Sequence, residues 1–176
     1  MTVRQILLLG NPSLYRSSEE MRKEELVALK PVITDLHDTL MAFRKRWGAG
    51  RAIAAPQIGV MKRLIYMHIE SPIILINPCL EDKSEEMFEV WDDCMSFPEL
   101  LVKVPRHRSC RVVYRDMTWQ QKSMNLDSDL SELLQHEIDH LDGTLAVSHA
   151  IDKTAFALRS QSKFTDYDRS NLPKAI

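Results

Sequence analysis

The spacing of apolar residues predicts a helix in the first third of the chain. Between Glu25 and Trp47, apolar side chains recur every three or four positions, as on the buried face of a helix. These residues are Leu29, Val32, Ile33, Leu36, Leu40 and Phe43. Pro31 suits the first turn of such a helix, because no intrahelical bond is lost with its N–H there. Gly48 and Gly50 then end it.

The middle of the chain is instead typical of strands. Short apolar runs are bounded by turn residues such as Pro72 and Asn77-Pro78. The runs are Leu64 to Ile69, Ile73 to Ile76, Leu101 to Val104 and Cys110 to Tyr114. A hairpin return is expected from Trp119 to Met124.

A second helix is predicted near the end of the patterned region. Asp127 to Asp129 carry carboxylates that suit an N-cap and a first turn. The helix runs through Leu141, and Gly143 suits the position after its end. A helix, then strands, then a helix predicts an α+β fold. We expect small mixed or antiparallel β-sheets packed around this second helix, with the N-terminal helix beside them.

Composition fits one globular domain over residues 1–176, with a polar tail from about Ser160. The formal net charge is −2, from 23 Lys and Arg against 25 Asp and Glu. A chain so close to neutral has no basic field to recruit nucleic acid or anionic lipid. The longest apolar stretch near the start, Ile6 to Leu9, is too short for an export signal or a membrane span.

The three cysteines, Cys79, Cys94 and Cys110, are too few and unevenly placed for a disulfide framework. Together with the lack of an export signal, this predicts a cytoplasmic protein. Cys79 and Cys110 lie in or beside apolar runs and are expected to be small core residues.

Candidate chemistry lies on the second helix, where residues 135–140 read Gln-His-Glu-Ile-Asp-His. Four helical residues advance about 400°, so His136 and His140 lie on one face and can bind one cation. Glu137 lies beside that face, close enough to meet a metal-bound water. The alternative is an amphipathic surface helix that carries two histidines and several acids by chance. The apolar residues around the motif favour inward histidines, which need partners.

The third metal ligand has to come from elsewhere in the chain. In the extended zinc-peptidase motif it would lie at Ala146, and His149 comes three residues too late. Cys94 is the candidate, since a thiolate with two imidazoles suits zinc or ferrous iron. The alternative for Cys94 is a small core residue, which its acidic and polar neighbours disfavour.

Three segments in this order resemble the peptide deformylase family. Residues 50–59, Gly-Arg-Ala-Ile-Ala-Ala-Pro-Gln-Ile-Gly, are similar to its Gly-hydrophobic-Gly-hydrophobic-Ala-Ala-x-Gln. Residues 92–96, Asp-Asp-Cys-Met-Ser, are similar to its Glu-Gly-Cys-Leu-Ser. Residues 135–143 match its Gln-His-Glu-x-Asp-His-Leu-x-Gly closely. The likeness covers most of the chain and is weakest after about Ala150.

The resemblance implies removal of the formyl group from an N-formylated peptide or nascent-chain N-terminus, a step of protein biosynthesis. It implies one divalent metal ion, commonly Fe²⁺ with Zn²⁺, Ni²⁺ or Co²⁺ as substitutes, held by Cys94, His136 and His140. A metal-bound water would attack the amide carbonyl, with Glu137 exchanging protons. The side chain of Gln57 and the backbone N–H of Met95 would point at the formyl oxygen.

The substrate-facing frame departs from the family pattern. Arg51 replaces a hydrophobic residue and Ala52 a glycine, and Asp92-Asp93 replaces Glu-Gly. Glu132 lies one turn before His136 on the same side of the helix. The residues expected to contact substrate are Gly50, Arg51, Ala52, Asp92, Asp93, Glu132 and Leu133.

These departures motivate an alternative substrate class. Arg51 could lie across from Glu132. Formyl-methionine would then be a poorer substrate than a formyl-peptide whose first side chain is polar or charged. The alternative for Glu132 is a first-turn acid that faces water and is favoured by the helix dipole.

Other functions remain open from the sequence. One is a related amidase with a polar or charged preference, and another is a catalytically weak relative that only binds formyl-peptides. Keeping both Glu137 and Gln57 argues against the second, because a metal clamp needs neither. A conventional zinc peptidase is disfavoured by Ala146.

Overall fold

The computed structural model describes residues 2–167. Its first elements are helical: η1 (Pro12–Tyr15), η2 (Lys23–Ala28) and α1 (Leu29–Trp47). The predicted N-terminal helix is therefore confirmed as α1. It ends at Gly48, whose φ of 66° is left-handed and whose N–H bonds the carbonyl of Arg44.

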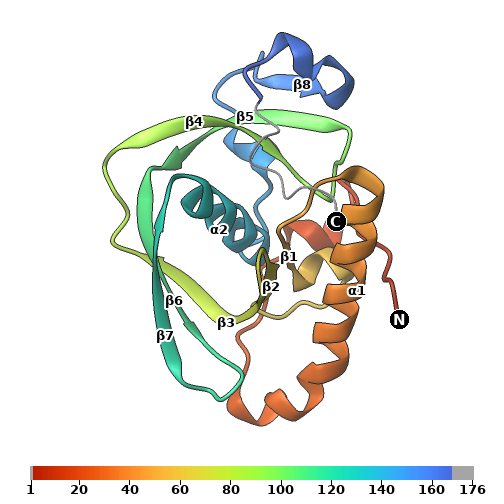
Figure 1. The fold of residues 1–176 in the computed structure, drawn as a ribbon, viewed down its shortest axis with the longest axis vertical. Coiled ribbons are helices and arrows are strands. Elements are labelled where there is room, and N and C mark those ends of the chain that lie inside the picture. The colour runs from red at the N-terminus through yellow and green to blue at the C-terminus, as the bar shows by residue number, and fades with distance from the viewer. Residues whose placement is uncertain (1, 168–176) are drawn as a thin grey trace.

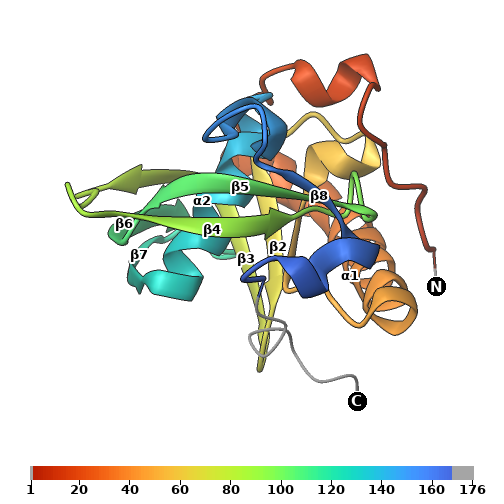
Figure 2. The same ribbon diagram turned by 90° about the horizontal axis from the view of Figure 1, so that it is seen from above.

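Two antiparallel sheets follow, as the predicted fold class requires. The five-stranded sheet has the order β1 (Ala52–Ala54), β2 (Leu64–His68), β3 (Pro72–Glu81), β6 (Ser109–Arg115), β7 (Gln121–Asp127). The three-stranded sheet has the order β4 (Met87–Asp93), β5 (Leu100–His107), β8 (Phe156–Leu158). In Figure 2, β4 and β5 run across the view whereas β2 and β3 run nearly up and down, so the sheets cross steeply.

The second predicted helix is α2 (Ser128–Leu141), which Figure 1 shows in the middle of the molecule with β4 and β5 above it. Both Leu134 and Leu141 are fully buried in it. They pack in one core cluster with Ile65 of β2 and Leu75 of β3. A helix buried on most sides needs internal polar partners for every inward polar group.

Strands β1 and β2 lie between the two helices. Alternate residues such as Ile65 belong to the core cluster of α2, whereas Ile53 and Leu64 belong to the cluster that contains Leu36 and Leu40 of α1. Because successive side chains point to opposite faces, a strand covered on both faces shows a continuous apolar run. This explains why β2 was easy to predict.

Three strands were not predicted: β1, β4 and β8. The sequence of β4, Met-Phe-Glu-Val-Trp-Asp-Asp, has no continuous apolar run, because its side chains are mostly partly exposed. Asp92 and Asp93 were expected between strands, but they end β4 and pair in register with Val102 and Leu101 of β5.

The core prediction holds for Cys110 but is wrong for Cys79. Cys110 is 4% exposed, whereas Cys79 is exposed. The register of β3 shifts between Ile76 and Cys79, and Asn77 has a φ of 49°. After this irregularity Leu80, not Cys79, faces the α2 core cluster.

The last described elements are η4 (Ala146–His149), β8 and η5 (Arg159–Phe164). The predicted polar tail from about Ser160 thus begins within a 3₁₀ helix packed beside β8, and residues 168–176 of that tail lie outside the described residues. Within residues 2–167 no helix has the length and apolarity needed to cross a membrane.

Candidate metal centre

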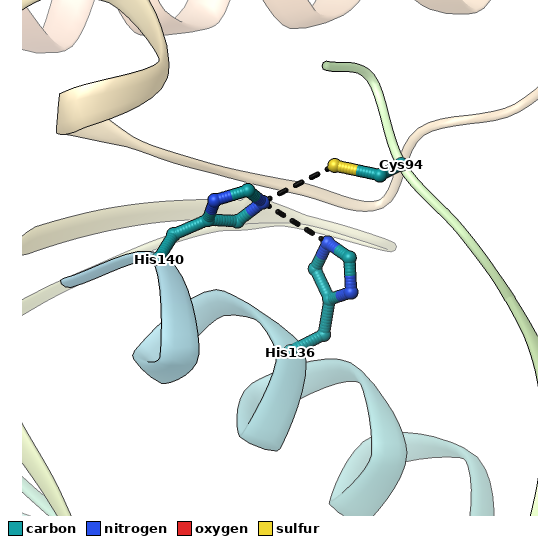
Figure 3. A group of neighbouring side chains, drawn as sticks. All are labelled: Cys94, His136 and His140. Atoms are coloured by element: carbon teal, nitrogen blue, oxygen red, sulfur yellow. Dashed lines mark hydrogen bonds between the residues drawn. The ribbon is translucent and has the colours of Figure 1, made fainter. Parts of the chain in front are cut away.

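Three predicted ligand side chains meet at one point inside the molecule (Figure 3). His136 and His140 lie one turn apart on α2, and Cys94 follows the last residue of β4. The Nε2 atom of His140 is 3.2 Å from the Sγ atom of Cys94 and 3.2 Å from Nε2 of His136. All three donor atoms lie within 4.8 Å of one another, and each residue is at least 94% buried.

This donor set fits a divalent metal. Ligand atoms roughly 2.0–2.3 Å from a tetrahedral metal lie roughly 3.3–3.8 Å from each other. The two separations of 3.2 Å that His140 makes with Cys94 and His136 are close to this range. Burial, followed by the charge of His136, holds the pKa of His140 well below its ordinary value. His140 is therefore neutral, which is the form that binds a metal.

Asp92 orients the other histidine. Its Oδ1 atom lies 2.8 Å from Nδ1 of His136, and Arg106 donates from Nη2 to its Oδ2 at 2.7 Å. Burial by itself would lower the pKa of His136, but the charges of Asp92 and Cys94 outweigh it and raise this pKa well above its usual range. A carboxylate on Nδ1 fixes the ring so that Nε2 faces the metal position.

The structure corrects the expectation that Asp92 contacts substrate. Its side chain is 1% exposed and its two carboxylate oxygens are directed to His136 and Arg106. Arg106 is itself 3% exposed and bridges Asp92 to Asp139 of α2, to which its Nη1 donates at 2.6 Å. Asp92 is therefore enclosed by His136 and Arg106 and is not open to a ligand beside Cys94.

Glu137 is a buried acid, and one of its carboxylate oxygens is free to accept a hydrogen bond. It is 4% exposed, and its Oε2 atom has no hydrogen-bond partner among residues 2–167. Burial is the main cause that raises the pKa of Glu137 to about 7. A carboxyl group that titrates near neutrality can both accept and release a proton.

Gln57 and Met95 border the same space. Gln57 is 1% exposed; its Oε1 accepts from the Ala54 N–H at 2.9 Å, which turns its Nε2 toward Ser96 Oγ at 3.2 Å and Cys94 Sγ at 3.7 Å. The backbone N–H of Met95 has no partner within the part of the chain that the structure describes. Both groups are thus N–H donors beside the ligand cluster.

A cavity of about 40 Å³ adjoins two of the three ligands, Cys94 and His136. All of the residues expected to contact substrate line it, except Asp92. Among them, Asp93 is already engaged, because its Oδ2 accepts from Nη2 of Arg159 at 2.7 Å and from the hydroxyl of Tyr167 at 3.2 Å.

Glu132 faces this cavity and not the solvent. It is 9% exposed, and its Oε2 accepts from Nη2 of Arg51 at 3.0 Å, so the predicted pairing of the two is confirmed. Nη1 of Arg51 pairs with Asp129 on the first turn of α2. Burial, then the charge of Asp92, raises the pKa of Glu132 to about 7.

A family model described as polypeptide deformylase matches residues 3–155. The chain belongs to the polypeptide deformylase family. Members of this family are metal-dependent hydrolases, in keeping with the Cys94, His136 and His140 cluster.

Individual relatives agree with the family match. The peptide deformylase of Erythrobacter litoralis is 30% identical over 85% of this chain and 90% of its own. That of Pseudothermotoga lettingae is 32% identical over 94% of this chain and 97% of its own. Among solved structures, a peptide deformylase from Legionella pneumophila has a TM-score of 0.76 at 30% identity, covering 84% of this chain and 86% of its own. The Thermotoga maritima peptide deformylase has a TM-score of 0.78 at 26% identity, covering 86% and 100%.

Sequence reasoning missed several residues of this deformylase-like site. They are Phe43 in the cavity wall, Ser96 beside Gln57, and the buried charges Arg106, Asp139 and Arg159. Ser96 lies in the second motif, whereas no local pattern marks the others, because their contacts in the site are with residues distant in sequence. The one available signal of a buried ion pair was Arg106, which lies close to the apolar residues of β5.

Proposed function

We propose that this chain hydrolyses the N-formyl amide at the N-terminus of a peptide. The observation that supports this most is the convergence of Cys94, His136 and His140 beside an unpartnered carboxylate of Glu137 and a small cavity. Family membership supplies the formyl group as the acyl portion of the substrate.

The three ligands would hold one divalent metal ion. When bound, such an ion acidifies a water molecule and polarises an amide carbonyl. A thiolate with two imidazoles suits Fe²⁺, which we propose as the native ion, and also Zn²⁺, Ni²⁺ or Co²⁺.

Glu137 would act as the proton-transfer group. Its Oε2 takes the proton of the attacking water and returns it to the leaving amine nitrogen as the C–N bond breaks. Burial raises the pKa of Glu137 and favours its protonated form, which supports its role in holding the proton between the two steps.

Gln57 and Met95 would stabilise the oxyanion that forms on the formyl oxygen. The 3.7 Å contact between Gln57 Nε2 and the sulfur of Cys94 is weak, so that N–H can turn to a substrate oxygen. Removing one such donor typically raises the barrier by about 3 kcal/mol.

One experiment tests the proposal directly. The chain is purified without oxygen, its metal is quantified, and formate release is measured from a panel of formyl-Xaa peptides. We expect about one metal ion per chain and formate from at least one peptide. A metal-loaded protein that releases no formate from any peptide would overturn the proposed function.

A further inference from the structure

The cavity beside the ligand cluster ends in buried charges. Arg51 precedes β1, and its guanidinium pairs with Glu132 through Nη2 at 3.0 Å and with Asp129 through Nη1. The side chain of Arg51 is 12% exposed and that of Glu132 is 11% exposed. Any part of a substrate that enters the cavity beyond the formyl group must contact this ion pair.

The distance along α2 fits one substrate side chain. Glu132 lies one helical turn before His136, a rise of about 5.4–6 Å. In a formyl-peptide the side chain is attached to the carbon next to the formylated nitrogen. With the formyl group beside Cys94 and His136, this side chain lies within reach of Arg51 and Glu132, both of which line the cavity.

The free volume is small. About 40 Å³ holds roughly three water-sized groups. The four heavy atoms of a methionine side chain, Cβ, Cγ, Sδ and Cε, need more room than this. A long apolar side chain therefore enters the cavity only if the ion pair of Arg51 with Glu132 breaks.

The polarity of the cavity also disfavours an apolar group. Glu132 Oε1 has no partner among residues 2–167, and neither has Glu137 Oε2. The carboxylates of Glu132 and Asp129 share the single guanidinium of Arg51. An apolar side chain would bury these acceptors without a donor, whereas a hydroxyl would satisfy one of them.

We propose that Arg51 and Glu132 make this cavity select a short, hydrogen-bond-donating side chain of serine type next to the formyl group, in preference to methionine. This selectivity rests on the proposed function. Arg51 limits the length of the side chain, and Glu132 supplies the acceptor for its hydroxyl.

A panel of four peptides separates length from hydrogen bonding. Formyl-Ser, formyl-2-aminobutyryl, formyl-Met and formyl-Glu peptides share one downstream sequence. Aminobutyrate has the size of serine without the donor, and glutamate brings a like charge to Glu132. We expect kcat/KM for formyl-Ser to exceed each of the others by about tenfold or more, the cost of one unmet buried acceptor.

The double variant Arg51→Ile/Glu132→Ile removes both charges together, so that neither is left unpaired. We expect it to favour formyl-Met over formyl-Ser. The matched control is Arg111→Ile/Glu81→Ile, which removes an exposed ion pair of 2.7 Å between β6 and β3. That control should rank the four peptides by kcat/KM in the same order as the parent does.

Binding to the Glu137→Gln variant, measured by calorimetry for the same four peptides, gives a readout that needs no turnover. The proposed selectivity is overturned if formyl-Ser is preferred over formyl-Met by less than tenfold in kcat/KM. It is also overturned if the formyl-Ser and formyl-2-aminobutyryl peptides have equal kcat/KM. If no peptide releases formate, the proposed function fails, and the order of the dissociation constants still decides the selectivity.

Discussion

Cys94 differs from the other cysteines of the chain in the atoms around its sulfur. Its Sγ lies 3.2 Å from His140 Nε2 and accepts the Ser96 N–H at 3.4 Å. The sulfur of Cys110 has one polar contact within the described residues, the hydroxyl of Ser131 at 3.3 Å, and Cys79 is exposed. At the scale of single residues, the ligand atoms of the site therefore contact mainly one another.

Cys94→Ser should therefore lose the metal. A hydroxyl is a poor ligand for a borderline or soft ion, whereas two imidazoles alone hold it weakly. Metal content per chain, measured after gel filtration, should fall from about one to a small fraction. Cys79→Ser, which replaces an exposed thiol, is the control and should keep its metal. Full metal content in Cys94→Ser would contradict the ligand assignment.

Glu137→Gln should keep the metal and lose turnover. The amide has nearly the same shape but cannot carry the proton from water to the leaving nitrogen. Loss of general acid–base catalysis typically lowers the rate by about a hundredfold to ten-thousandfold. Metal analysis and formate release on one preparation measure both properties. A rate within threefold of the parent would remove Glu137 from the proton transfer.

At the scale of elements, α2 serves as both core and site. Leu134 and Leu141 fix it in the core, and this fixes the direction of His136 and His140. Its end is held by the N-terminal segment, because the Ser18 N–H bonds the Leu141 carbonyl at 2.7 Å.

Gly143 makes that close approach possible. Its φ is 72°, and a Cβ there would lie 2.8 Å from the backbone carbons of Tyr15 and Arg16. Gly143→Ala should lower the free energy of unfolding by more than the roughly 1–2 kcal/mol that a left-handed residue alone costs. Urea unfolding measures this loss.

The matched control for this prediction is Gly48→Ala. Gly48 ends α1 with a φ of 66°, and among residues 2–167 no atom beyond its two chain neighbours lies within 4 Å of the position that a Cβ would take there. It should therefore lose only the conformational part, roughly 1–2 kcal/mol. Equal losses of unfolding free energy in the two variants would show that the backbone of Tyr15 and Arg16 moves aside at no energetic cost.

At the scale of the whole molecule, the end of the described chain returns to the site. Strand β8 pairs with β5, and Arg159 and Tyr167 both bind the carboxylate of Asp93. The family match ends at residue 155, so these contacts lie beyond the matched range. They neutralise Asp93 at the edge of the cavity.

Tyr167 gives this contact a pH dependence. Burial, then the negative charge of Asp93, raises the pKa of Tyr167 from 10.0 to about 12. A group whose pKa is raised on folding contributes stability that is complete below the unfolded pKa and is lost above the folded one. The contribution of Tyr167 should therefore be complete below pH 10 and disappear by about pH 12.

Ultraviolet titration of tyrosinate in the parent and in Tyr167→Phe measures the effect. The difference between the two curves should show one tyrosine that ionises near pH 12. A difference curve centred on the ordinary tyrosine pKa of about 10 would mean that Tyr167 does not contact Asp93 in solution.

The sequence by itself determined the features that depend on neighbouring residues. Helical periodicity identified α1 and α2, and the spacing of His136 and His140 placed both on one face. Continuous apolar runs identified β2 because both of its faces are covered. These signals are local, since they repeat within one or two turns or a few strand residues.

Only the tertiary structure decided the rest. Strand β4 carries no apolar run, and the irregularity at Asn77 turned Cys79 outward against the expected alternation. The ion pair of Arg106 with Asp139 joins residues 33 positions apart, and the carboxylate of Asp92 lies against His136 and not at the substrate position. Such contacts depend on the path of the whole chain, because a buried charge takes whichever opposite charge the packed core brings within reach.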